Sequence, residues 1–161
     1  MKPTFLSSGL ARAGQGVLLL ATAACAQSAA TTTVAIPPVP PGEARIWIYR
    51  DFEPSESLGL AAVSLNGVDA GYAQPAGGAF YRDVPPAHYH IAVASYATDF
   101  SQSSDVDLAA GQEAFVKVES LSAWATGENV GSFKRDVFYA RLIPSQPARA
   151  EIAHMTVYGG S

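Results

Sequence analysis

Residues 60–72 read LAAVSLNGVDAGY, and this stretch decides the fold class. Small and apolar residues flank Asn66-Gly67, a dipeptide that accepts the positive φ angles of a two-residue hairpin turn. The stretch therefore predicts two antiparallel strands, 60–65 and 68–72, joined by a tight turn.

Turn residues also separate the other apolar runs along the chain. Pro85-Pro86 closes one apolar run because proline donates no backbone hydrogen bond to a sheet, and Gly111 lies in a turn before another. Strands that follow each other every eight to twelve residues or so are typical of an antiparallel sandwich. We therefore expect a mainly β protein, an antiparallel β-sandwich of the immunoglobulin or prealbumin type with a short C-terminal helix. The expected strands are 44–50, 60–65, 68–72, 79–84, 88–94, 105–108, 114–118 and 138–143.

The tail changes to a helical period. Ala148, Ile152 and Met155 recur at i, i+4 and i+7, and Ser145-Gln146-Pro147 has the residue types of a helix N-terminus. About ten residues of helix, from near 147 to near 157, should follow.

The first expected strand, 44–50, is apolar on both faces, which indicates that both faces are covered. We expect the C-terminal helix to cover the face that carries Trp47 and Tyr49.

The N-terminal segment has the composition of an export signal. Its charges are Lys2 and Arg12, and residues 17–24 form a short apolar core before small residues. Two processing routes stay open. In one, Ala24-Cys25-Ala26 is a cleavage site and the mature chain begins at Gln27. In the other, residues 22–25 form a lipobox and Cys25 is acylated, so that two lipid signals anchor the chain to a membrane.

A linker rich in Ala, Ser and Thr follows, and it ends in the proline-rich run IPPVPPG at 36–42. Such a run favours an extended, semi-rigid spacer. The expected domains are a signal peptide at 1–26, a linker at 27–42, a β-sandwich at 43–144 and a helix and tail at 145–161.

Composition limits the class of protein. The chain of 161 residues has a formal net charge of −4 and ten Lys and Arg, which argues against a nucleic-acid binder. Its single Cys excludes an intramolecular disulfide framework. We expect contact with a membrane only through a lipid on Cys25.

Four motifs together resemble a known type of domain. They are PGEARIWIYR at 41–50, SLNGVDAG at 64–71, FYRDVPPAHYHI at 80–91 and LAAGQEAFVKV at 108–118. In this order they are similar to a family of bacterial lipoproteins and periplasmic proteins classed as a domain of unknown function, in the style of PEGA and carboxypeptidase-regulatory-like sandwiches. The resemblance implies a small exported β-sandwich, often lipid-anchored, without known catalytic residues.

His88 and His90 form one candidate site. Two residues apart on a strand, they share a face and lie roughly 7 Å apart, so both imidazoles can reach one metal ion. A third ligand is needed, for which His154, Asp83 and Asp99 are candidates. The alternative is a pair of solvent-facing histidines.

Asp105 and Asp107 also share a strand face. Two carboxylates can bind calcium or carry out acid–base chemistry, or they simply form the wet face of a half-buried strand.

The stretch from Ser122 to Asp136 is the longest connection without clear periodicity. It holds Trp124, Phe133, Lys134 and Arg135, and a long loop on a rigid scaffold is a common recognition element. The alternative is a loop folded on its own aromatic residues.

The sequence lacks the Gly-x-Ser-x-Gly motif of serine hydrolases and a phosphate-binding glycine loop. We therefore expect a non-catalytic binding or scaffolding module of the cell envelope, periplasmic or anchored to the outer membrane, with no cofactor. One alternative is a periplasmic metal-binding protein that uses His88 and His90. The other is an accessory domain that recognises a glycan or a peptide through the loop around Trp124.

Overall fold

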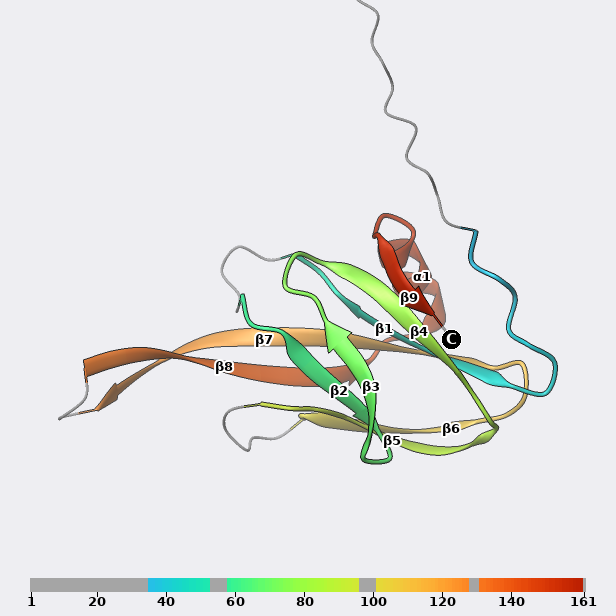
Figure 1. Cartoon of the computed structure of the whole chain (residues 1–161), viewed down its shortest axis with the longest axis horizontal. Helices are drawn as coiled ribbons and strands as arrows, with labels where there is room; N and C mark the ends of the chain where they lie inside the picture. Colours follow the sequence, from blue (N-terminus) through green and yellow to red (C-terminus); the bar gives the residue numbers. More distant parts are fainter. Residues whose placement is uncertain (1–34, 53–57, 96–100, 128–130, 161) are drawn as a thin grey trace, which may run out of the picture. The chain divides into compact units, whose positions relative to one another are not determined.

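Nine strands and one helix make up the described chain (Figure 1). The structure is a computed structural model and describes residues 35–52, 58–95, 101–127 and 131–160, of which 121–127 and 131–136 are described by their backbone. The predicted signal peptide and Cys25 lie outside these ranges. The elements are β1 (Ala44–Arg50), β2 (Ala61–Leu65), β3 (Val68–Ala73), β4 (Gly78–Val84), β5 (Ala87–Val93), β6 (Ser103–Leu108), β7 (Glu113–Gly127), β8 (Gly131–Leu142), α1 (Ser145–Ile152) and β9 (Val157–Gly160).

The strands form two sheets that pack against each other, which confirms the β-sandwich. One sheet has the order β8-β7-β1-β4-β9 and the other the order β3-β2-β5-β6. Two pairings depart from the expected antiparallel pattern, since β1 pairs with β7 and β4 with β9 in parallel. Parallel neighbours need a long crossover, and the chain passes through the other sheet or through α1 to make it.

The hairpin between β2 and β3 forms as its sequence predicts. Asn66 has φ 50° and Gly67 has φ 81°, the two positive angles of a type I′ turn. The Asn66 side chain also reaches β5, because its Nδ2 donates to the carbonyl of His88 at 3.1 Å and its Oδ1 accepts from the amide of His90 at 2.7 Å. The turn therefore fixes the position of both histidines.

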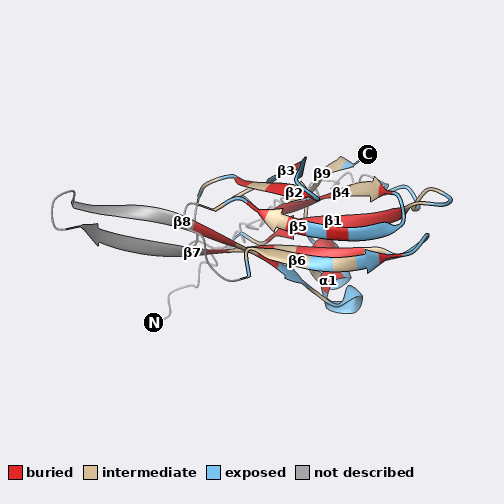
Figure 2. Ribbon diagram, turned by 90° about the horizontal axis from the view of Figure 1, so that it is seen from below, coloured by how far each residue is buried: buried red, intermediate tan, exposed pale blue. Residues whose placement is uncertain are grey.

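The core lies between the two sheets, and β1 contributes to it from one face. Ala44, Ile46 and Ile48 point into this core, and Figure 2 shows β1 buried along its length. The opposite face carries Trp47 and Tyr49, which pack with further aromatic residues of the sheet and with α1. That second cluster consists of Trp47, Tyr49, Ala79, Tyr81, Phe115, Ala148 and Ile152, and it confirms that the helix covers the outer face of the first strand.

Two charged pairs tie the helix to β7. Lys117 Nζ donates to Glu151 Oε2 at 2.9 Å, and Arg149 binds Glu113. Burial lowers the pKa of Lys117, but hydrogen bonds to Asp51 and Glu151 outweigh it and raise that pKa overall.

The limits of the helix differ from the sequence prediction. Pro144, not Ser145, is the N-cap residue, and no side chain caps the helix. The helix ends at Ile152 because the chain turns there, and β9 follows where the prediction had helix or tail. Gly78 of β4 lets β9 come close. Its φ is 128°, and a Cβ at this position would lie only 2.8 Å from the carbonyl oxygen of Thr156, the residue before β9.

The described end of the linker contacts the sandwich. Arg45 Nη1 donates to the carbonyl of Pro37 at 2.7 Å, and the same side chain binds Asp83. The proline-rich run is thus held beside the start of β1. Within the described ranges, no helix combines the length and the apolar character that crossing a membrane requires.

Candidate functional site

A buried arginine of β1 contacts both strands at the base of the β7–β8 hairpin. Arg50, at the end of β1, is 1% exposed. It donates to the carbonyl of Gly59 at 2.9 Å and to Ser120 Oγ at 3.1 Å, and its guanidinium carbon lies 5.2 Å from the centre of the Phe138 ring. A buried cation is expensive unless it is well paired, and here its contacts join β1 to both strands of the hairpin.

The base of the hairpin belongs to the core. Val137, Phe138 and Ala140 are buried, and the amide of Phe138 donates to Ser95 Oγ at 3.1 Å. These contacts fix the direction in which the two strands leave the sandwich.

Beyond this base the two strands continue alone. β1 pairs with β7 only as far as Lys117, whereas β7 pairs with β8 up to Gly127 opposite Gly131. We call residues 121–127 and 131–136 the distal hairpin. Figure 1 shows β7 and β8 continuing past the other strands of their sheet. Within the described chain, the distal hairpin has no third strand on either edge.

The stretch 122–136 was predicted to be a loop, and this is wrong: its described residues lie in the strands β7 and β8. Trp124 pairs with Lys134, and Phe133 and Arg135 pair with alanines of β7. All four predicted recognition residues therefore lie in paired strands. The sequence of this stretch shows no clear alternation of apolar and polar residues, so its pattern gave no strand signal.

The histidine pair lies on the exposed face of β5, opposite two aspartates of β6. The register pairs His88 with Asp107 and His90 with Asp105. In each pair the imidazole Nδ1 lies 2.9 Å from a carboxylate oxygen, and His88 Nε2 lies 3.4 Å from Asp105. We call these four residues the His–Asp ladder. The shared strand face predicted for each pair is present, and its solvent exposure is high, at 58% for the His88 side chain.

The ladder is an electrostatic unit. The hydrogen bond to Asp107 raises the pKa of His88, and the hydrogen bond from His90 lowers the pKa of Asp105. Opposite charges across neighbouring strands stabilise the pairing, and charged residues on an edge strand such as β6 discourage pairing with other chains.

The structure brings none of the described candidates for a third ligand into the pair of His88 and His90. Asp83 binds Arg45 in the other sheet, and His154 follows α1, which packs on the outer face of that sheet. Asp99 lies outside the described residues. In the part of the chain that is described, no three His, Cys, Asp or Glu side chains are arranged to hold a metal ion. The metal site stays a prediction.

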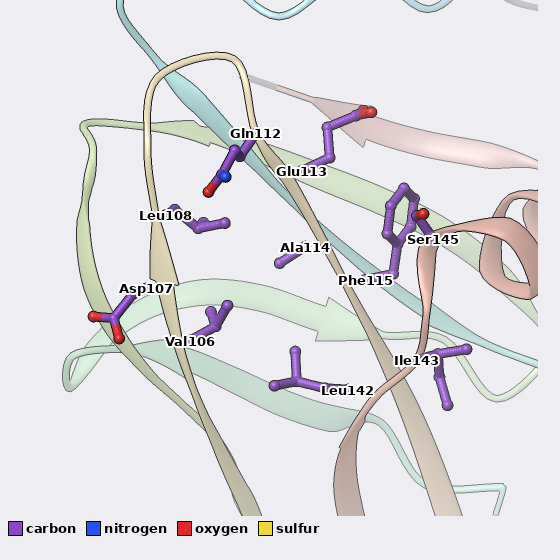
Figure 3. A pocket seen from close by; sticks show the side chains of 10 residues that line it. All are labelled: Val106, Asp107, Leu108, Gln112, Glu113, Ala114, Phe115, Leu142, Ile143 and Ser145. Atoms are coloured by element: carbon purple, nitrogen blue, oxygen red, sulfur yellow. The ribbon is translucent and has the colours of Figure 1, made fainter.

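A cavity of about 380 Å³ opens between β6 and the start of β7. Figure 3 shows its apolar side chains, among them Val106, Leu108 and Leu142. Two polar residues on its border already have partners: Gln112 Oε1 accepts from the amide of Ala109, and Glu113 accepts from the Trp47 indole. A second cavity, of about 530 Å³, lies at the β2–β3 turn.

Comparison with known proteins found no match to this chain among family models, curated protein sequences or solved structures.

Proposed function

We propose that this chain is a non-catalytic, exported module of the cell envelope that binds a partner or forms a scaffold, and that the distal hairpin is its interaction element. The observation that carries the proposal is the register of β7 and β8, which continues to Gly127 after the pairing with β1 has ended at Lys117.

An isolated two-stranded ribbon is marginally stable in water. This one leaves a base that is fixed by the buried Arg50 and by buried apolar residues of β8. Such an anchored base presents the ribbon in a defined direction, which is what a binding element needs.

The edges of the distal hairpin favour a protein partner. Along an unpaired edge the backbone amides and carbonyls can hydrogen-bond to an added strand, whose alternate side chains then give specificity. A peptide backbone offers the matching groups at the matching spacing, whereas a glycan does not. Strand addition from an extended segment of an envelope protein is therefore the binding mode we propose.

Export and anchoring rest on residues 1–26, with Cys25 either acylated or removed. The mass of the mature N-terminus distinguishes the two. A mass that begins at unmodified Gln27 would end the lipoprotein proposal and leave a periplasmic module.

The hairpin is tested by site-specific photocross-linking in envelope vesicles. A photoreactive residue replaces Ala123 or Ala125 in the hairpin, and Ala150 on the exposed side of α1 serves as the matched control. We expect one defined adduct from the hairpin positions and none from Ala150.

A second variant joins Leu121 to Val137, which pair in the native register, through Asn-Gly. It removes the rest of the distal hairpin and keeps the buried base. This variant should keep the cooperative thermal unfolding of the sandwich. Added in excess, it should leave the adduct of the photoreactive protein unchanged, whereas an excess of the intact protein should suppress that adduct. Equal adducts from hairpin and control positions, or none at all, would contradict the proposal.

A further inference from the structure

An arginine points between the two sheets. Along β4, Phe80 and Val84 belong to the core between the sheets, and Arg82 lies between them in the alternation of the strand, so it faces inward too. Charged residues seldom occupy an inward position unless they are paired or reach water.

The partners of Arg82 among the described residues are a backbone carbonyl and an aromatic ring, neither of which carries a negative charge. Its Nη1 donates to the carbonyl of Tyr81 at 2.9 Å, and its guanidinium carbon lies 5.2 Å from the centre of the Phe80 ring. Among the described residues, no carboxylate forms an ion pair with it. A carbonyl and an aromatic ring are weak substitutes for a carboxylate.

This arginine borders the cavity of about 530 Å³ at the β2–β3 turn. The volume lies in the range of small-molecule sites. The apolar part of the wall comes from Leu65, Val68, Ala70, Val84 and Tyr89. Val68 is 70% exposed at the rim, so this apolar surface is accessible from solvent.

The acidic residues of the wall are already bound. Asp83 accepts two hydrogen bonds from Arg45, at 2.6 and 2.8 Å, and Asp69 Oδ1 accepts from the amide of Gly71 at 2.9 Å. Arg82 is thus the cation in the described wall of the cavity. The negative charges of Asp69 and Asp83 repel a ligand that carries two or more negative charges. The cavity therefore suits a single negative charge.

Glycine on the facing strand leaves room for the end of the Arg82 side chain. Gly71 of β3 has φ 129°, and a Cβ there would lie 3.3 Å from Arg82 Nη2. A side chain at this position would therefore crowd the guanidinium.

We propose that this cavity binds a small amphipathic monocarboxylate, with the carboxylate on Arg82 and the apolar chain against Leu65, Val68 and Val84. The planar guanidinium matches a carboxylate with two parallel hydrogen bonds. This site lies apart from the distal hairpin, so the inference goes beyond the proposed function and does not depend on it.

The test is calorimetric titration of the exported protein with decanoate, and with 1-decanol as the uncharged probe of equal length. Arg82→Met keeps an unbranched apolar side chain and removes the guanidinium with its charge. We expect this variant to bind decanoate about tenfold more weakly or worse and to bind decanol unchanged. Arg141→Met, on an exposed arginine of β8, is the matched control and should bind both probes as the wild type does.

A second variant guards against misfolding of the first. Val68→Glu adds a carboxylate at the exposed rim, where it should not disturb the core, and repulsion should weaken decanoate binding alone. The proposal is overturned if decanoate shows no saturable binding below about 1 mM, or if folded Arg82→Met binds it as tightly as the wild type.

Discussion

Replacing Asp83 by Asn removes the partner of a buried arginine and keeps the shape of the side chain. Arg45 and Asp83 face each other across β1 and β4 in a two-pronged pair, with distances of 2.6 and 2.8 Å. Their side chains are 2% and 10% exposed. The hydrogen bonds to Asp83 raise the pKa of Arg45. Without them the arginine still keeps its charge, because a guanidinium is not deprotonated in proteins.

The expected loss of stability follows from this geometry. Breaking a buried ion pair by removing one partner costs about 3–5 kcal/mol, because the remaining charge is buried without compensation. Arg45 keeps other contacts, among them the carbonyl of Pro37 at 2.7 Å and the Tyr81 ring at 3.9 Å. We therefore expect the lower end, about 3 kcal/mol, which in a domain of this size lowers Tm by roughly 10 °C.

Urea denaturation followed by tryptophan fluorescence measures the change. The double variant Arg45→Met, Asp83→Leu replaces the pair by apolar residues and should unfold within about 1 kcal/mol of the wild type. Glu119→Ala breaks an exposed pair with Arg141 and should cost less than about 1 kcal/mol. A loss below about 1 kcal/mol for Asp83→Asn, or a double variant as unstable as the single one, would refute the reasoning.

Three further predictions concern the ladder, the helix and the path to β9. Asp107→Asn should lower the pKa of His88, measured by NMR titration. Because folding raises that pKa above 6.5, its contribution to stability is full below pH 6.5 and is lost as the pH rises through the folded-state pKa, so unfolding of the variant should depend less on pH there. Ile152→Ala should cost about 2–4 kcal/mol in urea denaturation by emptying the contact between helix and sheet, whereas Ala150→Ser on the exposed side should stay within about 0.5 kcal/mol. Gly78→Ala should cost more than about 1 kcal/mol, because its φ of 128° and the nearby carbonyl leave no room for a methyl group; unchanged thermal unfolding would contradict this.

Local signals were enough for most of the sandwich. Asn66-Gly67 requires its turn whatever surrounds it, and Pro85-Pro86 ends a strand because of its own chemistry. The doubly apolar strand 44–50 implied a cover, and the amphipathic tail was the segment able to provide it. These predictions rest on residues that act within one turn or one strand.

The rest depends on register between distant strands. His88 and His90 were expected to share a face, as were Asp105 and Asp107, but only the pairing of β5 with β6 brings the two sets together. The same holds for the partners Arg45 and Asp83. No periodicity in the sequence encodes which strand lies next to which.

Two features were not predicted from the sequence. The distal hairpin continues β7 and β8 beyond their pairing with β1, and its sequence shows no clear alternation that would indicate strands. The strand β9 ends in Gly159-Gly160, and glycines are turn signals in a sequence. Here they instead allow a close approach to β4, which a sequence pattern does not express.

The two buried arginines give β1 a mechanical role. Arg45 lies near its start and holds the proline-rich linker, and Arg50 lies at its end and holds the base of the hairpin. Between them the strand spans about 17 Å and is buried on both faces. Both arginines therefore reach their partners from one strand that is packed along its whole length. A strand with a polar anchor at each end and an apolar middle can thus keep the linker and the hairpin at a fixed separation, which is the geometry that the proposed scaffold requires.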